Sequence, residues 1–83
     1  MPTILPDTNW EESLAQLPIT DEQKNVLRLA IGKILRKSRT FPKIGEAEFD
    51  DLIRKVWFIK FQPSGANYIL ARKRGRLCLQ HED

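Results

Sequence analysis

The apolar residues of this 83-residue chain change their spacing near Val56, and this change constrains the fold more than any other feature of the sequence. Before Val56 they recur every three or four residues, which is the period of an α-helix. After it they alternate, which is the period of a β-strand. The sequence therefore predicts an α+β fold in which three helices are followed by a two- or three-stranded antiparallel sheet with a basic β-hairpin.

Two helix starts carry capping-box spacing, a Thr followed three residues later by Glu or Gln, at Thr8 and Thr20. The first helix is expected to end before Pro18, because proline disfavours a helical residue in front of it, and the second to run to about Ser38. A third helix is expected from about Glu46. The apolar stripes of the three helices are Trp10, Leu14 and Leu17; Leu27, Ala30, Ile31, Ile34 and Leu35; and Phe49, Leu52 and Ile53.

The alternating part of the chain begins with a strand over residues 56–61, which the Pro63–Gly65 turn closes. Residues 68–80 are expected to fold back on themselves as a hairpin with Gly75 in the left-handed position of a three-residue loop. That register gives the hairpin one uniformly apolar face. The pairs that face each other are then Ala71 with Leu77 and Ile69 with Leu79.

Length and composition indicate one domain, residues 1–83, with frayed ends at 1–7 and 81–83. The single Cys78 can form no internal disulfide, which is typical of a reducing, cytoplasmic setting. The start of the chain has neither the basic region nor the apolar run of a secretory signal, and no stretch is long and apolar enough to span a membrane.

Charge is distributed in blocks along the chain. Residues 1–23 contain five acids and no base, and residues 24–45 contain seven bases and no acid. The blocks repeat with four acids in residues 46–51 and seven bases in residues 52–80, so the net charge of +3 hides strong local charge. Clustered like charges attract an oppositely charged surface, which favours a polyanion or an acidic protein as the partner.

The basic residues form two groups, and both are candidate nucleic-acid contacts. Arginines one or two helical turns apart can each reach a separate phosphate, and Gly32 beside them would let a nucleic-acid backbone approach closely. A merely solvated helix face normally mixes acids with bases, whereas this one contains no acid. The candidates are Arg28, Lys33, Arg36, Arg39 and Lys43 in the first group, and Arg72, Lys73, Arg74 and Arg76 at the hairpin tip in the second.

Two aromatic residues, Trp57 and Tyr68, are of the type that stacks on bases in single-strand binders. An aromatic residue in a strand of a small domain is more often part of the core. We therefore expect Trp57 to be buried.

Catalysis finds little support in the sequence, and no catalytic residue, cofactor or metal site is predicted. His81, the only histidine, stands beside the acidic end of the chain, and no serine has a second histidine to activate it. The acids of residues 46–51 are explained by the dipole at a helix N-terminus.

The expected order of helices before strands looks like that of small toxins that cleave RNA with basic side chains and without metal. Those folds open with a strand, whereas this chain is expected to open with a helix. A toxin-like ribonuclease is therefore the least favoured interpretation.

The order of three helices followed by a hairpin also resembles the winged-helix arrangement over about residues 8–80, with Lys73–Arg76 as the wing. In that fold the helix before the wing reads the major groove with its first turn. Here that turn, residues 46–51, carries four acids, which phosphates would repel. The resemblance thus implies binding through the long basic helix and the wing.

Two classes of function remain open. The chain is either a nucleic-acid-binding domain that contacts DNA or RNA mainly through phosphates, or a protein-interaction module. In the second case its basic surface meets an acidic partner, or the acidic segment 1–23 meets the basic surface of another copy in a homodimer.

Overall fold

The computed structural model describes residues 3–6, 9–36 and 40–82. In this part of the chain three helices and four strands follow one another in the order β-α-α-α-β-β-β. The elements are β1 (Thr3–Pro6), α1 (Trp10–Ala15), α2 (Asp21–Leu35), α3 (Glu46–Lys55), β2 (Phe58–Gln62), β3 (Ala66–Lys73) and β4 (Arg76–Glu82).

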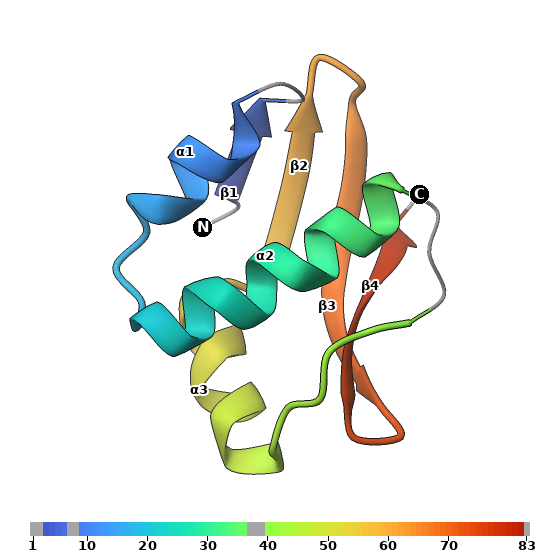
Figure 1. The fold of residues 1–83 in the computed structure, drawn as a ribbon. Helices are drawn as coiled ribbons and strands as arrows, with labels where there is room; N and C mark the ends of the chain where they lie inside the picture. Colours follow the sequence, from blue (N-terminus) through green and yellow to red (C-terminus); the bar gives the residue numbers. More distant parts are fainter. Residues whose placement is uncertain (1–2, 7–8, 37–39, 83) are drawn as a thin grey trace.

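The four strands form one mixed sheet in the order β1-β2-β3-β4 (Figure 1). β1 pairs with β2 in parallel, while β2 with β3 and β3 with β4 are antiparallel pairs. All three helices lie in the connection between β1 and β2, as a parallel pair requires a long crossover.

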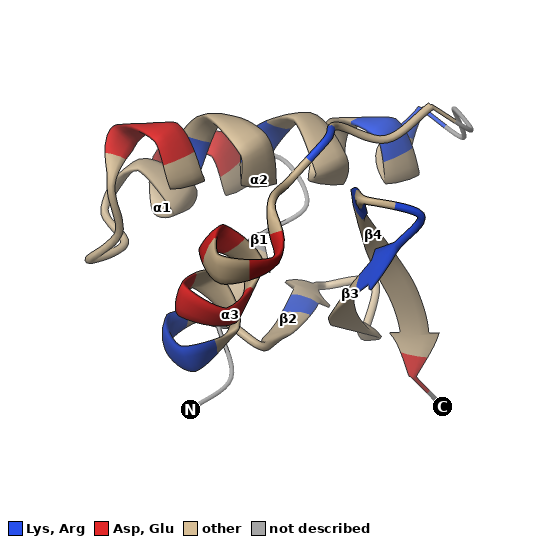
Figure 2. Cartoon of the chain, turned by 90° about the horizontal axis from the view of Figure 1, so that it is seen from below, with Lys and Arg blue, Asp and Glu red and all other residues tan. Residues whose placement is uncertain are grey.

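The helices leave one face of the sheet uncovered. α1 and α2 lie over one face, α3 packs at the end of the sheet, and no described element covers the opposite face (Figures 1 and 2). The core fills the space between α2 and the covered face. Its buried side chains are Leu5, Trp10, Leu14, Leu27, Ala30, Ile31, Ile44, Leu52, Val56, Ile59, Phe61, Leu70, Leu77 and Leu79.

Helix positions follow the sequence pattern closely. The capping box of α2 is confirmed: Thr20 Oγ1 accepts a hydrogen bond from Gln23 N at 3.1 Å, and Gln23 Oε1 accepts one from Thr20 N at 3.0 Å. α2 ends at Leu35, before the predicted end near Ser38, which lies outside the described residues, as does Thr8 of the other predicted capping box. No helix in the described ranges is long and apolar enough to cross a membrane.

The predicted order of helices followed by strands is wrong, because a strand opens the described chain. Residues 3–6 belong to the segment expected to fray, yet they form β1, in which Leu5 is fully buried beside its partner Phe61. At the other end, His81 and Glu82 continue β4. The sequence does not reveal this strand, because a four-residue edge strand with a distant parallel partner has neither a turn signal nor a clear alternation. Pro6 is tolerated in it because β1 lies at an edge of the sheet. The resemblance to the winged-helix arrangement assumed that all three helices precede the strands. β1 stands before the helices, so the observed order differs from that arrangement.

The predicted three-residue hairpin loop is also wrong. Arg74 and Gly75 form a two-residue turn in which φ is 53° and 75°, the positive values that tight hairpin turns require. Lys73 therefore pairs with Arg76, and Ala71 pairs with Cys78 instead of Leu77. The prediction assumed that only one face of the hairpin is apolar, whereas both faces carry apolar residues.

Burial of the β4 side chains on the covered face can be tested directly by placing a charge on either face of this strand. Leu77→Asp should abolish the cooperative thermal melt, because a buried unpaired carboxylate costs several kcal/mol, which approaches the total stability of about 5–15 kcal/mol of a small domain. Gln80→Asp places the same charge on an exposed position of the same strand and should retain the melt. A cooperative melt of Leu77→Asp would mean that Leu77 does not lie in the core.

Candidate nucleic-acid interface

The loop between α2 and α3 pairs with the hairpin tip. Ile44 N donates to Gly75 O at 2.9 Å, Leu77 N donates to Pro42 O at 2.9 Å, and Lys43 lies opposite Arg76 in an antiparallel bridge. The loop thereby covers the tip end of β4, which would otherwise be an open sheet edge. As a consequence Lys43 from the first predicted basic group lies beside the second group.

Two of the hairpin arginines hold this loop in place. Arg72 Nε donates to Ile44 O at 2.9 Å, and the Arg76 guanidinium donates to Phe41 O at 2.7 Å. A charged donor on a backbone carbonyl forms a stronger hydrogen bond than a neutral one. Arg72 and Arg76 are therefore structural as well as cationic, which the sequence alone does not reveal.

The structure brings five of the predicted site residues together at one corner of the molecule, and we call this group the basic tip. Lys43, Lys73 and Arg74 are exposed, so their charges are accessible to a ligand. The members of the basic tip are Lys43, Arg72, Lys73, Arg74 and Arg76.

The predicted residues of α2 are spread along the helix. Arg28 is exposed in the middle of α2 and donates to Asn25 Oδ1 at 2.6 Å, whereas Lys33 and Arg36 lie at the C-terminal end. Arg39 lies outside the described residues. The C-terminal end of α2 lies near the C-terminal end of β4, whereas the basic tip lies at the opposite, hairpin end of that strand (Figure 1).

Gly32 does not provide the open surface on which the sequence suggests that a nucleic-acid backbone could approach the helix. It is buried, and the Arg36 guanidinium lies only 2.9 Å from the point where a Cβ on Gly32 would stand. The missing side chain therefore makes room for Arg36, which folds back over the helix.

Acidic and basic segments are separated in space as well as in sequence. Figure 2 shows the acids of α1, α3 and the first half of α2 on one side, and the cations of the α2 end, the following loop and the hairpin tip on the other. Within the described ranges the structure contains one side-chain ion pair, Asp51 with Lys55 at 3.1 Å. The basic tip is thus not neutralised by the described acids of its own chain.

The uncovered side of the sheet, which we call the open face, carries apolar residues on all four strands. Because side chains alternate along a strand, the residues next to the buried Ile59, Leu70 and Leu77 point to this face. Its apolar members are Ile4, Phe58, Ile69, Ala71 and Cys78, and its polar members are Lys60, Gln62, Asn67, Lys73, Arg76, Gln80 and Glu82.

Burial of Trp57, expected from the sequence, is contradicted by the structure. Its side chain is 45% exposed, and its ring lies 5.3 Å from the ring of Phe58 at the start of β2. Val56 takes the buried position that follows α3, and β2 begins only at Phe58, so Trp57 lies before the strand while Ile59 and Phe61 are buried as the alternation predicts. Tyr68 by contrast belongs to the covered face, where its ring packs edge-on against Phe61 at 5.4 Å.

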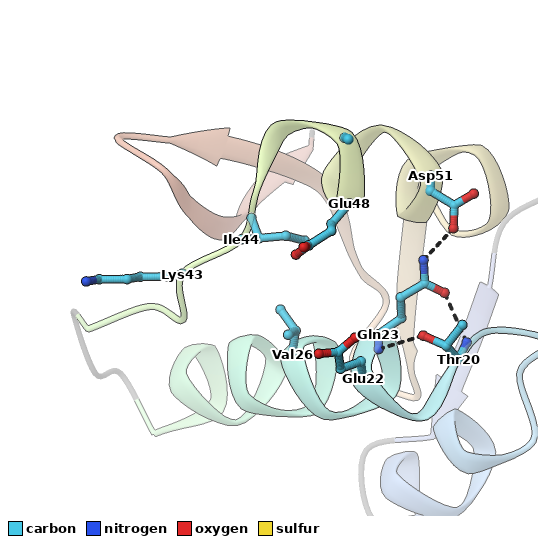
Figure 3. A pocket seen from close by; sticks show the side chains of 9 residues that line it. Thr20, Glu22, Gln23, Val26, Lys43, Ile44, Glu48 and Asp51 are labelled. Carbon is cyan, nitrogen blue, oxygen red and sulfur yellow. Dashed lines mark hydrogen bonds between the residues drawn. The ribbon is translucent and has the colours of Figure 1, made fainter.

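A groove of about 480 Å³ lies between the first turns of α2 and α3 (Figure 3). Glu22 and Glu48 reach into it from the two helices, whereas Lys43 points away from it. The two glutamates make the groove acidic, and the groove adjoins the basic tip, because Lys43 is one of the residues that line it. Its apolar lining consists of Val26, Ile44 and Ala47.

Gln23 ties the two helices together at this groove. Its Nε2 donates to Asp51 Oδ2 at 2.6 Å while its Oε1 caps α2. The hydrogen bond from Gln23, followed by the one from Lys55, holds the pKa of Asp51 below its ordinary value.

The described ranges hold no group of three His, Cys, Asp or Glu side chains that could bind a metal ion. His81 lies in β4 with its ring 5.4 Å from that of Tyr68.

The chain matches no family model, no curated protein and no solved structure. Its function therefore has to be inferred from its own geometry and charge.

The two roles of the hairpin arginines can be separated by substitution. Arg76→Met keeps the aliphatic stem but removes the donor to Phe41 O, so it should lower the stability by about 1–2 kcal/mol. In a domain of this size that corresponds to a fall in Tm of roughly 4–16 °C. Arg74→Met, in the exposed turn, is the matched control and should leave Tm unchanged. Equal melts for the two variants would show that the Arg76 bond does not hold the loop.

Asp51 should make the stability depend on pH in the acid range. Its pKa is lowered in the folded state, so the charged carboxylate contributes stability that is present above its ordinary pKa of 3.8 and is lost as the pH falls through the folded value. Asp51→Asn should therefore melt below the parent protein at about pH 7, and the two melts should converge as the pH falls below the folded pKa of Asp51. A difference that persists in acid would indicate an effect on packing instead.

Proposed function

We propose that this chain is a nucleic-acid-binding domain that contacts DNA or RNA mainly through phosphates. The basic tip forms the centre of the binding surface, and the cations at the C-terminal end of α2, near the other end of β4, provide a second group of contacts. The observation that supports the proposal is the pairing of the loop with the hairpin, because it brings Lys43 of the first basic group beside Arg76 of the second.

Exposure and charge balance support this assignment. Lys43, Lys73 and Arg74 are exposed, and the acids of α1, α2 and α3 lie on the other side of the molecule, while Glu82 lies at the end of β4 away from the hairpin. Because the loop is fixed to the hairpin by hydrogen bonds, the cations are held together before a ligand arrives, which lowers the entropic cost of binding. Phosphate contacts of this kind carry no sequence information, so little sequence preference is expected.

The winged-helix mode of docking is not part of the proposal. In that mode α3 would enter the major groove with its first turn, and here this turn contains Glu46 and Glu48. Nor does the proposal include RNA cleavage, although β1 supplies the opening strand that toxin-like ribonucleases have. Binding through charge requires no catalytic residue, and incubation with labelled RNA would reveal cleavage directly.

A protein-interaction module is the second candidate, and the separation of acids from bases in Figure 2 favours it. A surface with two opposite poles can associate with a second copy in head-to-tail fashion, or its basic tip can bind an acidic protein. Sedimentation at low and high salt distinguishes self-association from a monomer.

Binding to nucleic acid should weaken steeply with salt. If about four to six phosphates are neutralised, log K should fall against log salt with a slope of roughly −3 to −5. Lys73→Glu with Arg74→Glu should reduce the affinity and make this slope shallower without lowering Tm, because both side chains are exposed.

The matched control is Lys24→Glu with Arg54→Glu, which changes the net charge equally on the first half of α2 and the last turn of α3. This variant should bind nearly as well as the parent protein. A flat salt dependence, or equal losses in both double variants, would refute binding through the basic tip and favour the protein-interaction module.

A further inference from the structure

We propose that the open face binds the bases of a single-stranded nucleic acid while the basic tip holds its phosphates. This inference rests on the proposed function and narrows its ligand from nucleic acid in general to unpaired strands.

Aromatic and apolar side chains on the open face supply the stacking surface. Phe58 and Ile69 are direct cross-strand neighbours in the middle of this face. Trp57, 45% exposed, packs beside Phe58 with its ring centroid 5.3 Å away and widens the aromatic surface. Unpaired bases of any sequence stack on aromatic rings of this kind, because every base has a π-face.

Cations flank this surface at both ends. Lys60 lies two residues beyond Phe58 on β2, and Lys73 and Arg76 lie at the hairpin end of β3 and β4. Lys60 pairs with Asn67, which is six residues before Lys73 on β3, so the two cationic ends are about 20 Å apart at a rise of about 3.3 Å per residue. A single strand laid along the face would thus place its phosphates on Lys60 and on the basic tip and its bases between them.

Asn67 adds an unused polar group to the same face. Its Oδ1 is buried without a hydrogen-bond partner, which is unfavourable in the unbound chain. An amino group on a base edge can donate to an amide oxygen of this type once the side chain rotates.

The charge of the open face favours a nucleic acid over a second copy of the chain. Its described charged side chains are Lys60, Lys73, Arg76 and Glu82, which leaves it net cationic. Two such faces would repel each other, whereas a polyanion is attracted. A duplex is disfavoured as well, since its bases are stacked on each other and cannot lie on a sheet.

The experiment compares two fluorescein-labelled DNA strands of equal length, oligo(dT) and its fully abasic counterpart, which share their phosphates and differ in their bases. Trp57→Ala should weaken oligo(dT) binding about 5-fold or more and leave binding of the abasic strand unchanged. Trp57→Phe retains an aromatic ring and should restore most of the affinity. Lys73→Glu with Arg74→Glu should weaken both strands.

Intrinsic fluorescence gives an independent measurement. Trp10 is only 8% exposed, so quenching by oligo(dT) should come from Trp57 and should disappear in Trp57→Phe. The abasic strand should cause no quenching.

The outcomes separate the two proposals. If both strands bind the parent protein and Trp57→Ala weakens neither, or weakens both equally, the open face does not bind bases although the proposed function stands. If neither strand binds at low salt, the proposed function itself fails and this inference fails with it. Sedimentation that shows a dimer which Trp57→Ala dissociates would also overturn the inference, because the face would then be covered by a second copy.

Discussion

The two-residue turn at Arg74 and Gly75 is the constraint on which the rest of the surface depends. By pairing Lys73 with Arg76 it fixes the register of β3 and β4, and a shift of one residue would exchange the two faces of one strand. This register buries Leu77 in the core and at the same time assigns Lys73 and Arg76 to the open face. Core packing and the distribution of surface charge are therefore decided by the same few backbone angles.

The hairpin and the loop that precedes α3 stabilise each other. Arg72 and Arg76 direct their donors to carbonyl groups of a segment about 30 positions earlier in the chain, and the backbone of that segment pairs with the hairpin in return. The same arginines retain their charge at the surface. Arg72 and Arg76 therefore have a structural and an electrostatic role, and charge reversal at either position changes both the loop contact and the surface charge. Lys73 and Arg74 are exposed, so substitutions there test the surface charge alone.

Local signals in the sequence predict the helices well and the sheet only in part. The capping box of Thr20 and Gln23 and the start of α3 depend on neighbouring residues and are confirmed. β1 depends on a partner far away in sequence, and the exposed Trp57 lies between the end of α3 and the start of β2 rather than in the predicted strand. The cations of the candidate site could be named from the sequence, but the pairing of Lys43 with Arg76 requires the fold.

The parallel pairing of β1 has a consequence for how the chain acquires its structure. Thr3 pairs with Ile59, 56 positions later, whereas the β3–β4 ladder closes over a two-residue turn. Closing a long loop costs more entropy than closing a short one, so local hairpins form before distant strands join them. During synthesis from the N-terminus, β1 emerges first but must wait with Leu5 unburied until β2 has been made. The strand that is synthesised first is thus the last to join the sheet.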